Sequence, residues 1–249
     1  MSDEEKSDDK ISRRKFIRNS SYVAGGAIGG GVLGAFLGTN FLDDETATKS
    51  NKNNTTNYNR ALMFFTRQAD FQILSAAAER IYPKDEIGPG AIELGAPYFI
   101  DHELAGAYGN NDREYMKGPF FEGTDYQGYQ TPLKRSAVFM VGIRELENQS
   151  KSKHNKSFVD LEGEQQDEIL KKFENDEVKL KHVSSAYFFD LLRSATISGT
   201  YADPLYGGNA DMDGWRMKDF PGSQMSYINR IGSEKFIDIK PKSLGDHYS

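Results

Sequence analysis

Apolar residues in this chain recur three and four positions apart, and nowhere do they alternate with polar residues over a useful length. Such spacing places the apolar side chains on one face of an α-helix, whereas alternation would place them on one face of a strand. Residues 61–232 are therefore predicted to form a single, mainly α domain, with long loops rich in glycine and aromatic residues between its helices.

Five segments combine the helical spacing with start or stop signals. Thr66 is expected to cap the first and Pro83 to stop it, while Thr131-Pro132 places a cap before a proline at the first helical position. The expected helices are 66–82, 97–104, 161–173 and 184–198, with a further helix beginning at 131–132. Their predicted core residues are Phe71, Leu74, Ala78, Ile81, Ile100, Leu104, Leu133, Ala137, Met140, Val141, Ile169, Leu170, Phe173, Phe188, Leu191, Leu192 and Ala195. Residues 106–130 are predicted to be a loop.

A second long loop follows the last predicted helix, which is expected to end at Gly199. It contains the only tryptophan of the chain, Trp215, together with the aromatic residues Tyr201, Tyr206 and Phe220. Disordered segments are poor in aromatic residues, so a loop of this length and composition is predicted to be fixed in place and functional. Its rings are expected to be buried either within the domain or against a partner.

The N-terminal region has the pattern of an export signal. Ser12, Arg13, Arg14 and Phe16 lie in the sequence SRRKFIR, which resembles the twin-arginine export motif, and residues 19–42 contain no charged residue. A basic segment followed by an apolar one is the arrangement of a signal sequence. Residues 1–42 are accordingly predicted to be a twin-arginine signal or membrane anchor. The protein is expected to pass through the twin-arginine translocase and to lie at the extracytoplasmic face of the cell membrane.

The apolar stretch 19–42 is also about long enough to cross a bilayer, which takes roughly 20 residues. Its glycines at 26, 30, 34 and 38 would form a small-residue stripe on a helix, which permits close helix packing but also arises by chance in a glycine-rich signal. No Ala-x-Ala site follows Leu42, so the segment is expected to stay attached as an anchor. Residues 43–60 are predicted to be a flexible linker, and residues 233–249 a polar, loosely held tail.

Composition excludes several classes of protein. The net charge of −6 offers no basic footprint for nucleic acid. The absence of cysteine removes disulfides, iron–sulfur clusters, thiolate zinc sites, covalently attached haem and a cysteine nucleophile. The predicted domain contains no P-loop and no dinucleotide-binding fingerprint, so the chain is expected to hold no cofactor of its own.

Few side chains indicate catalysis. His102 lies between Asp101 and Glu103, where it could act as a base or a ligand, although a surface or partner-facing histidine is the simpler interpretation. His154 and His247 lie in polar stretches and are expected to be solvated. The chain is predicted to have no catalytic residue, and a stand-alone extracytoplasmic enzyme that uses His102 with a neighbouring carboxylate is the less favoured alternative.

Alternating polar side chains in the second loop have the spacing that opens a calcium-binding loop: Asn209, Asp211, Asp213 and Gly214. Phe220 occupies the position where that loop needs a glutamate, so turn chemistry is the favoured interpretation. The Asp211 and Asp213 pair also belongs to the stand-alone enzyme alternative. The adjacent Gly-Gly pair could offer N–H groups to an anion, but a tight turn explains it equally well.

The pattern DPxYGGNxDxxGWxxxxxPG, at residues 203–222, resembles the C-terminal signature of the small chain, subunit 3, of gluconate 2-dehydrogenase. The resemblance extends upstream through the YG-x5-Y-xx-GPF segment, 108–120, and begins near residue 65. The matching residues are expected to be structural or partner-docking positions: Asp203, Pro204, Tyr206, Gly207, Gly208, Asn209 and Trp215. The family pattern supplies no acid, base or ligand that could be carried over to this chain.

This resemblance implies a non-catalytic accessory subunit of a membrane-associated, FAD-dependent dehydrogenase of sugars or sugar acids. The expected partner is a large flavoprotein subunit without its own export signal, which holds the FAD and is escorted across the membrane and anchored there. A cytochrome subunit accepts the electrons in some such complexes. A twin-arginine signal on a chain without a cofactor motif favours this interpretation, because that route exports folded proteins. The alternative is a membrane-tethered module that binds an envelope polymer through its tyrosine-rich loops.

Overall fold

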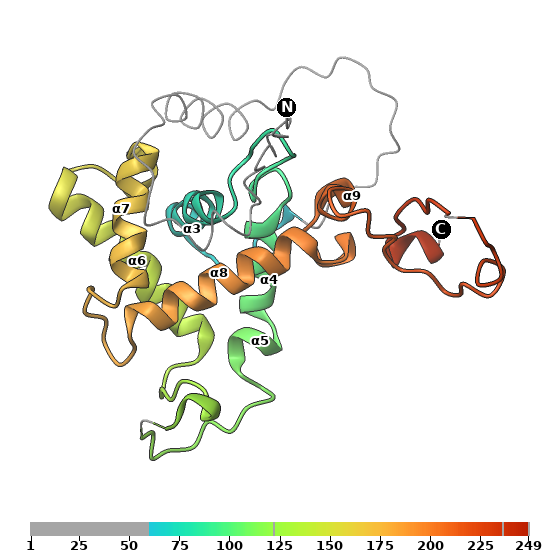
Figure 1. Cartoon of the computed structure of the whole chain (residues 1–249). Helices are drawn as coiled ribbons and strands as arrows, with labels where there is room; N and C mark the ends of the chain where they lie inside the picture. Colours follow the sequence, from blue (N-terminus) through green and yellow to red (C-terminus); the bar gives the residue numbers. More distant parts are fainter. Residues whose placement is uncertain (1–59, 122, 236, 249) are drawn as a thin grey trace, which may run out of the picture.

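The computed structural model describes residues 60–121, 123–235 and 237–248, and within them the secondary structure is helical, with isolated bridges but no extended strand. The mainly α prediction is confirmed for this part of the chain. The predicted signal or anchor, 1–42, lies outside the described residues, as does the linker up to residue 59. The helices are α3 (Gln68–Ile81), α4 (Ala96–Ala105), α5 (Ala107–Asn110), α6 (Arg135–His154), α7 (Gly163–Glu174), α8 (Ser185–Tyr201) and α9 (Asp213–Arg216) (Figure 1). Short 3-10 turns occur at Asp125–Gln127, Phe158–Asp160, Pro204–Tyr206, Ala210–Met212 and Gly245–His247.

Helix α8 crosses the body and packs against α4 and α7 (Figure 1). Its fully buried Phe188 lies edge-on to Phe139 of α6 and Phe173 of α7, with ring centroids 5.9 and 5.7 Å away. Edge-to-face contacts of this kind add specific geometry to apolar burial. Gly142 of α6 faces the same ring, and a Cβ at that position would lie 2.3 Å from the Phe188 side chain. A glycine is therefore what lets α6 and α8 approach this closely.

Helix α3 is buried on every side over its middle part, because each residue from Ile73 to Glu79 is at most 7% exposed. The predicted core residues Phe71, Leu74 and Ala78 are confirmed, whereas Ile81 is only half-buried. Small side chains over 75–78 let neighbouring elements reach the helix from several directions. A helical segment that is buried on all sides belongs to the interior of a protein rather than to its surface.

The buried face of α6 differs from the predicted one. Val138, Phe139, Ile143 and Leu146 are fully buried, while the predicted residues 133, 137, 140 and 141 are half-buried. The helix also begins at Arg135 rather than at 131–132. The Thr131 hydroxyl donates to the carbonyl of His182 at 2.9 Å and accepts from the Leu133 N–H at 3.2 Å, so Thr131 organises the approach to α6 instead of capping it.

The ends of α3 and α8 agree only in part with the start and stop signals in the sequence. Helix α3 begins after Arg67 with no side-chain cap, so the predicted role of Thr66 is wrong. The Ser184 hydroxyl does cap α8, accepting from the Tyr187 N–H at 3.1 Å. Gly199 does not stop α8, which continues to Tyr201. A Cβ at Gly199 would lie 3.0 Å from Ala96, so this glycine serves close packing against α4.

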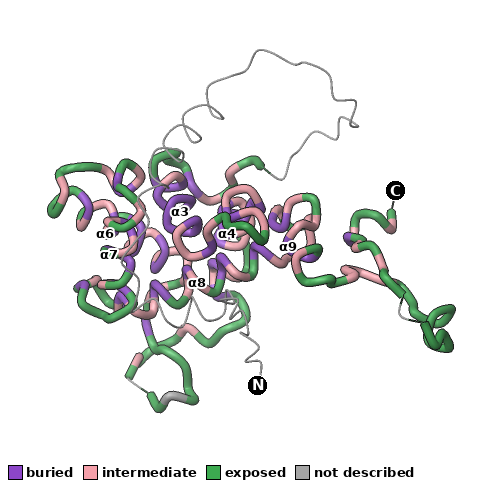
Figure 2. Tube along the Cα trace, turned by 45° about the horizontal axis from the view of Figure 1, so that its top comes forward, coloured by how far each residue is buried: buried purple, intermediate pink, exposed green. Residues whose placement is uncertain are grey.

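The C-terminal arm, defined as residues 223–235 and 237–248, extends past α9 and away from the helical body (Figures 1 and 2). Its described residues are mostly exposed. The predicted loosely held tail, 233–249, has bonds at the base of the arm: the Lys242 carbonyl accepts from the Ser223 N–H at 2.7 Å, and the Leu244 N–H donates to Asp203 at 2.8 Å. His247 Nε2 also bonds to the Ser223 carbonyl at 3.0 Å, so this histidine is half-buried rather than solvated.

Candidate partner-docking site

The signature loop, residues 202–222, is held against the end of α8 and the start of α4 by close backbone contacts. Asn209 N–H donates to the Gly199 carbonyl at 2.9 Å, and Ala210 N–H donates to the Leu94 carbonyl at 3.0 Å. A Cβ at Gly208 would lie 2.1 Å from the Gly199 oxygen, a distance that no side chain can occupy. The Gly-Gly pair therefore brings two backbones together, which is the structural interpretation of its glycines.

Asp203 connects this loop to the C-terminal arm. One carboxylate oxygen, Oδ1, accepts from the Leu205 N–H at 3.0 Å and caps the 3-10 turn Pro204–Tyr206. The other, Oδ2, accepts from the Leu244 N–H at 2.8 Å. Gly207 then turns the chain with a φ of 92°, a left-handed conformation that glycine adopts without steric cost. The Asp-Pro start of the signature is thus a turn, and it also holds the arm in place.

Asn209 is the buried polar centre of the loop. Its side-chain Oδ1 accepts from the Gly214 N–H at 2.8 Å, and its Nδ2 donates to the Ala202 carbonyl at 2.8 Å. The residue has a φ of 48°, a left-handed conformation that asparagine tolerates better than most residues. Both ends of the amide are engaged in backbone bonds, so Asn209 fixes the loop.

Asn209 and Asp213, which have the spacing of calcium ligands in the sequence, each bond to another group of the protein. The Asn209 oxygen is directed at the Gly214 N–H, and Asp213 pairs with Arg216 at 2.5 Å. Within the described residues, no three His, Cys, Asp or Glu side chains gather where they could hold a metal ion. The loop geometry supports the turn chemistry that the sequence favoured.

Trp215 lies inside the signature loop and is only 6% exposed. Its indole N–H donates to the Tyr201 carbonyl at 2.8 Å, and its ring meets Phe220 edge-on at 5.4 Å. Gly222 packs on the same ring, where a Cβ would lie 2.6 Å from an indole carbon. The ring therefore anchors the loop to the end of α8 within this chain, which decides between the two burial sites that the sequence left open.

Three apolar side chains of the same loop remain on the surface. Leu205 and Tyr206 are each 52% exposed and Phe220 is 48% exposed. They belong to a loop whose backbone is fixed by the bonds described above. Tyrosine is one of the residue types enriched among the side chains that anchor protein interfaces. Of the signature residues, Tyr206 is thus exposed on a fixed loop, whereas Gly208, Asn209 and Trp215 make contacts within the chain.

Two of the candidate catalytic residues, Asp101 and His102, use their side chains to bond backbone groups of the same chain. Asp101 is fully buried and accepts N–H groups from Met63, Phe64 and Phe65 at 2.6, 3.1 and 2.9 Å. The neighbouring His102 bonds through Nε2 to the Ala61 carbonyl at 2.9 Å. Together they fasten the segment before α3 onto α4, which is a structural role. The predicted solvation of His154 is wrong, because its Nε2 is buried and its Nδ1 lies 3.4 Å from Gln165.

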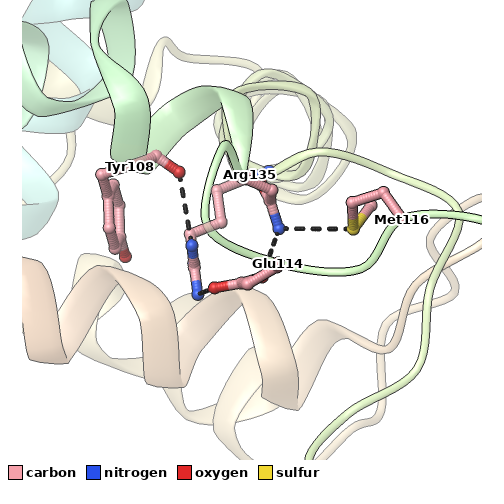
Figure 3. Close-up of polar contacts among 5 residues, drawn as sticks. Tyr108, Glu114, Met116 and Arg135 are labelled. Carbon is pink, nitrogen blue, oxygen red and sulfur yellow. Dashed lines mark hydrogen bonds and ion pairs between the residues drawn. The ribbon is translucent and has the colours of Figure 1, made fainter.

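A polar cluster that the sequence did not predict fixes the tyrosine-rich loop between α5 and α6 (Figure 3). The Arg135 guanidinium lies 4.5 Å from the centroid of the Tyr108 ring and forms an ion pair with Glu114. Asn111 donates to the other Glu114 oxygen at 2.7 Å. Burial raises the pKa of the Tyr108 phenol, and the arginine opposes that shift. The YG-x5-Y-xx-GPF segment thus begins at a structural tyrosine.

Comparison with known proteins assigns the class. Residues 68–222 match the family described as gluconate 2-dehydrogenase subunit 3. This match spans more than half of the 249 residues, so the chain belongs to that family. The family is named for one subunit of a gluconate 2-dehydrogenase complex, which implies association with the other subunits of such a complex. Neither the curated proteins nor the solved structures contain a match to this chain.

The match begins at the first residue of α3 and ends at Gly222, at the base of the arm. The arm therefore lies outside the matched region. No helix in 60–121, 123–235 or 237–248 has the length and apolar character needed to cross a bilayer. The segment that was predicted to do so, 19–42, is not among these residues.

Proposed function

We propose that this chain is the non-catalytic small subunit of an FAD-dependent dehydrogenase of gluconate type. In this proposal it escorts the large flavoprotein subunit through the twin-arginine translocase and anchors it at the extracytoplasmic face of the membrane through residues 19–42. The FAD lies in the large subunit, and a cytochrome subunit is a further candidate partner. The observation that carries the proposal is the family match over residues 68–222.

Two features of the chain support the escort role. The sequence SRRKFIR precedes an uncharged stretch, which is the arrangement of an export signal. The side chains of two catalytic candidates, Asp101 and His102, bond to backbone groups, and a third, Asp213, pairs with Arg216. A subunit that recognises a folded partner needs a fixed surface, and the signature loop offers exposed Leu205, Tyr206 and Phe220 on a rigid backbone.

The export role is tested by replacing Arg13 and Arg14 with lysine in the native host. Lysine keeps the positive charge but loses the planar guanidinium, so recognition by the translocase should fail. We expect both this chain and the flavoprotein to remain in the cytoplasm, measured as flavin-linked dehydrogenase activity in spheroplast and periplasmic fractions. Arg18→Lys is the matched control, because it makes the same change outside the pair. Normal export of the flavoprotein by the double variant would refute the escort role.

The docking surface is tested separately by replacing Leu205 and Tyr206 with serine. Both side chains are half-exposed, so these changes should leave folding intact and weaken co-purification of the flavoprotein. Tyr126→Ser is the control, because Tyr126 is fully exposed in a different loop. Unchanged co-purification after the double replacement would place the contact elsewhere on the chain.

A further inference from the structure

The C-terminal arm presents a group of apolar side chains to solvent. Met225, Ile228 and Ile231 are 72, 76 and 79% exposed, respectively. They lie within seven residues, around a turn in which the Arg230 and Ile231 N–H groups both donate to the Tyr227 carbonyl. Figure 2 shows the arm as largely exposed and extending away from the helical body. A group of exposed apolar side chains of this kind marks a site of contact with a membrane or with another protein.

The balance of charge in the arm differs from that in the body. Residues 60–221 contain 19 Lys and Arg against 26 Asp and Glu, whereas the arm contains four basic and three acidic side chains. The basic ones are Arg230, Lys235, Lys240 and Lys242. In the described part of the chain, the ion pairs join residues between Arg67 and Arg216, so none involves one of these four basic side chains. Among the described residues, the exposed apolar group is thus accompanied by four cations that pair with no carboxylate.

The base of the arm fixes where this surface is presented. Gly222 and Lys242 form a parallel bridge, and Asp203 accepts from the Leu244 N–H at 2.8 Å. Trp215, which packs on Gly222, connects the base to α8 through its bond to Tyr201. The tip around residues 225–231 is therefore held at a defined end of the molecule.

The proposed anchor, 19–42, would not by itself determine how the helical body is oriented relative to the membrane. An 18-residue linker, 43–60, can extend to about 60 Å, which exceeds the diameter of about 40 Å expected for a domain of this size. A second contact at the membrane would be intramolecular once the anchor is inserted, so even a weak one suffices to orient the domain. Apolar side chains beside basic ones are the composition of segments that lie in the interface of an anionic bilayer.

We propose that the arm is a second membrane contact, in which residues 225–231 enter the headgroup region of an anionic phospholipid bilayer while Arg230, Lys235 and Lys240 face the lipid phosphates. This inference rests on the proposed anchoring of the chain and adds to it the surface that orients the domain. The same side chains could instead cover a protein partner, and the experiment separates the two cases.

The test uses the absence of cysteine, which permits a single labelled position in the full chain. Ile228→Cys carries an environment-sensitive fluorophore, and Tyr126→Cys, at a fully exposed position in another loop, is the control. Both are reconstituted into vesicles of phosphatidylcholine with or without 30% phosphatidylglycerol, a composition that sets roughly a physiological anionic surface. We expect a blue-shifted emission at position 228 in the anionic vesicles and a water-like emission at position 126.

Two outcomes would overturn the inference. A water-like emission at 228 in every vesicle, or a shift that occurs only after the flavoprotein subunit is added, would exclude a lipid contact, and the second would assign the arm to the partner. Failure of the full chain to insert into any vesicle would instead contradict the proposed anchor. Flotation of the labelled chain with the vesicles distinguishes this failure from the first two results.

The charge contribution is tested by the triple variant Arg230→Gln, Lys235→Gln, Lys240→Gln, labelled at 228. Each neutralised cation should lower the ratio of bound to free arm about fivefold on anionic vesicles. Lys171→Gln, Lys179→Gln, Lys181→Gln is the matched control, because these exposed lysines lie on the body. An equal loss in both variants would show general charge attraction and would contradict a specific role for the arm.

Discussion

Trp215 shows how one residue can organise a loop. Its indole fills the space between the end of α8 and Gly222, and its N–H satisfies the Tyr201 carbonyl at the helix terminus. The carbonyl groups of a last helical turn need such partners because they have none within the helix. Apolar burial and a polar bond therefore act at the same position.

Replacing Trp215 with alanine should lower the free energy of unfolding by about 3–5 kcal/mol, because it leaves a cavity and an unpaired carbonyl. Urea denaturation followed by far-UV circular dichroism measures the change. Trp215→Phe keeps most of the ring and loses the bond, so it should cost less. A stable alanine variant that no longer binds the flavoprotein would mean that the ring contributes to docking rather than to the fold.

Glu79 is a buried acid whose carboxylate accepts from the Lys84 and Ile92 N–H groups at 3.1 and 2.8 Å. It shapes the 83–95 segment, which leads to the Leu94 carbonyl that receives the signature loop. Burial raises the pKa of Glu79 above its ordinary 4.5, and the two backbone bonds oppose this shift.

The raised pKa gives a pH dependence with a defined sign. From pH 4.5 up to the pKa in the folded state, the unfolded chain releases this proton while the folded chain retains it, so the free energy of unfolding should fall as the pH rises. Glu79→Gln should remove that slope, although it offers one carbonyl oxygen to two N–H groups and should be less stable at low pH. Urea titrations from pH 4 to 8 measure it, with exposed Glu86→Gln as the control. A slope that persists in the Gln variant would assign it to other groups.

At the scale of elements, the contact between α8 and the signature loop depends on glycines. Gly199 lies against Ala96 of α4, and Gly208 lies against the carbonyl of Gly199. The result is a stack of backbones at the end of α8 where side chains are excluded. The exposed residues Leu205 and Tyr206 are positioned by this stack.

Gly208→Ala should destabilise the chain by about 1–3 kcal/mol or more, because the added Cβ meets a backbone oxygen that cannot move aside as a side chain could. Gly232→Ala is the control, since a Cβ there meets nothing within 4 Å and its effect should stay within about 0.5 kcal/mol. Thermal and urea unfolding of both variants give the comparison. Equal stability of the two would show that the loop can retreat from α8 at little cost.

The helices themselves were largely predictable from spacing, whereas their faces and ends were not. Phe188, Leu192 and Ala195 are buried as the periodicity predicted. In α6 two apolar stripes compete, and contact with Phe188 and α7 selects the one that contains Phe139 and Ile143. Thr131 has the sequence of a cap, but its hydroxyl bonds to the distant His182 carbonyl. Tertiary contacts outweigh local preferences worth about 1 kcal/mol.

At the scale of the whole molecule, the apolar core and the arm are separate. The buried apolar residues among those described lie between Phe65 and Trp215, and the arm contributes only the polar Ser243 to the interior. The body therefore contains the burial that stabilises the fold, while the arm depends on a few polar bonds at its base.

Ending the chain after Gly222 should accordingly preserve the helical body. We expect a loss of about 1–3 kcal/mol in the free energy of unfolding, from the bonds that the arm makes to Asp203 and Pro221, with unchanged helical circular dichroism. The full-length chain with Asp203→Asn, which keeps one oxygen acceptor and loses the charge, is the comparison. Collapse of the helical signal on truncation would show that the arm is needed for folding.

The sequence by itself determined the helical class, the positions of most helices, the family signature and the expectation of an export signal, because these depend on spacing and on residue types along the chain. Only the tertiary structure decided that Trp215 turns inward, that Asn209 bonds backbone at both ends, and that Asp203 holds the arm. The physical reason is that a polar or aromatic side chain has several partners of nearly equal energy available locally. The choice among them is made by segments that are distant in sequence and meet only when the chain has folded.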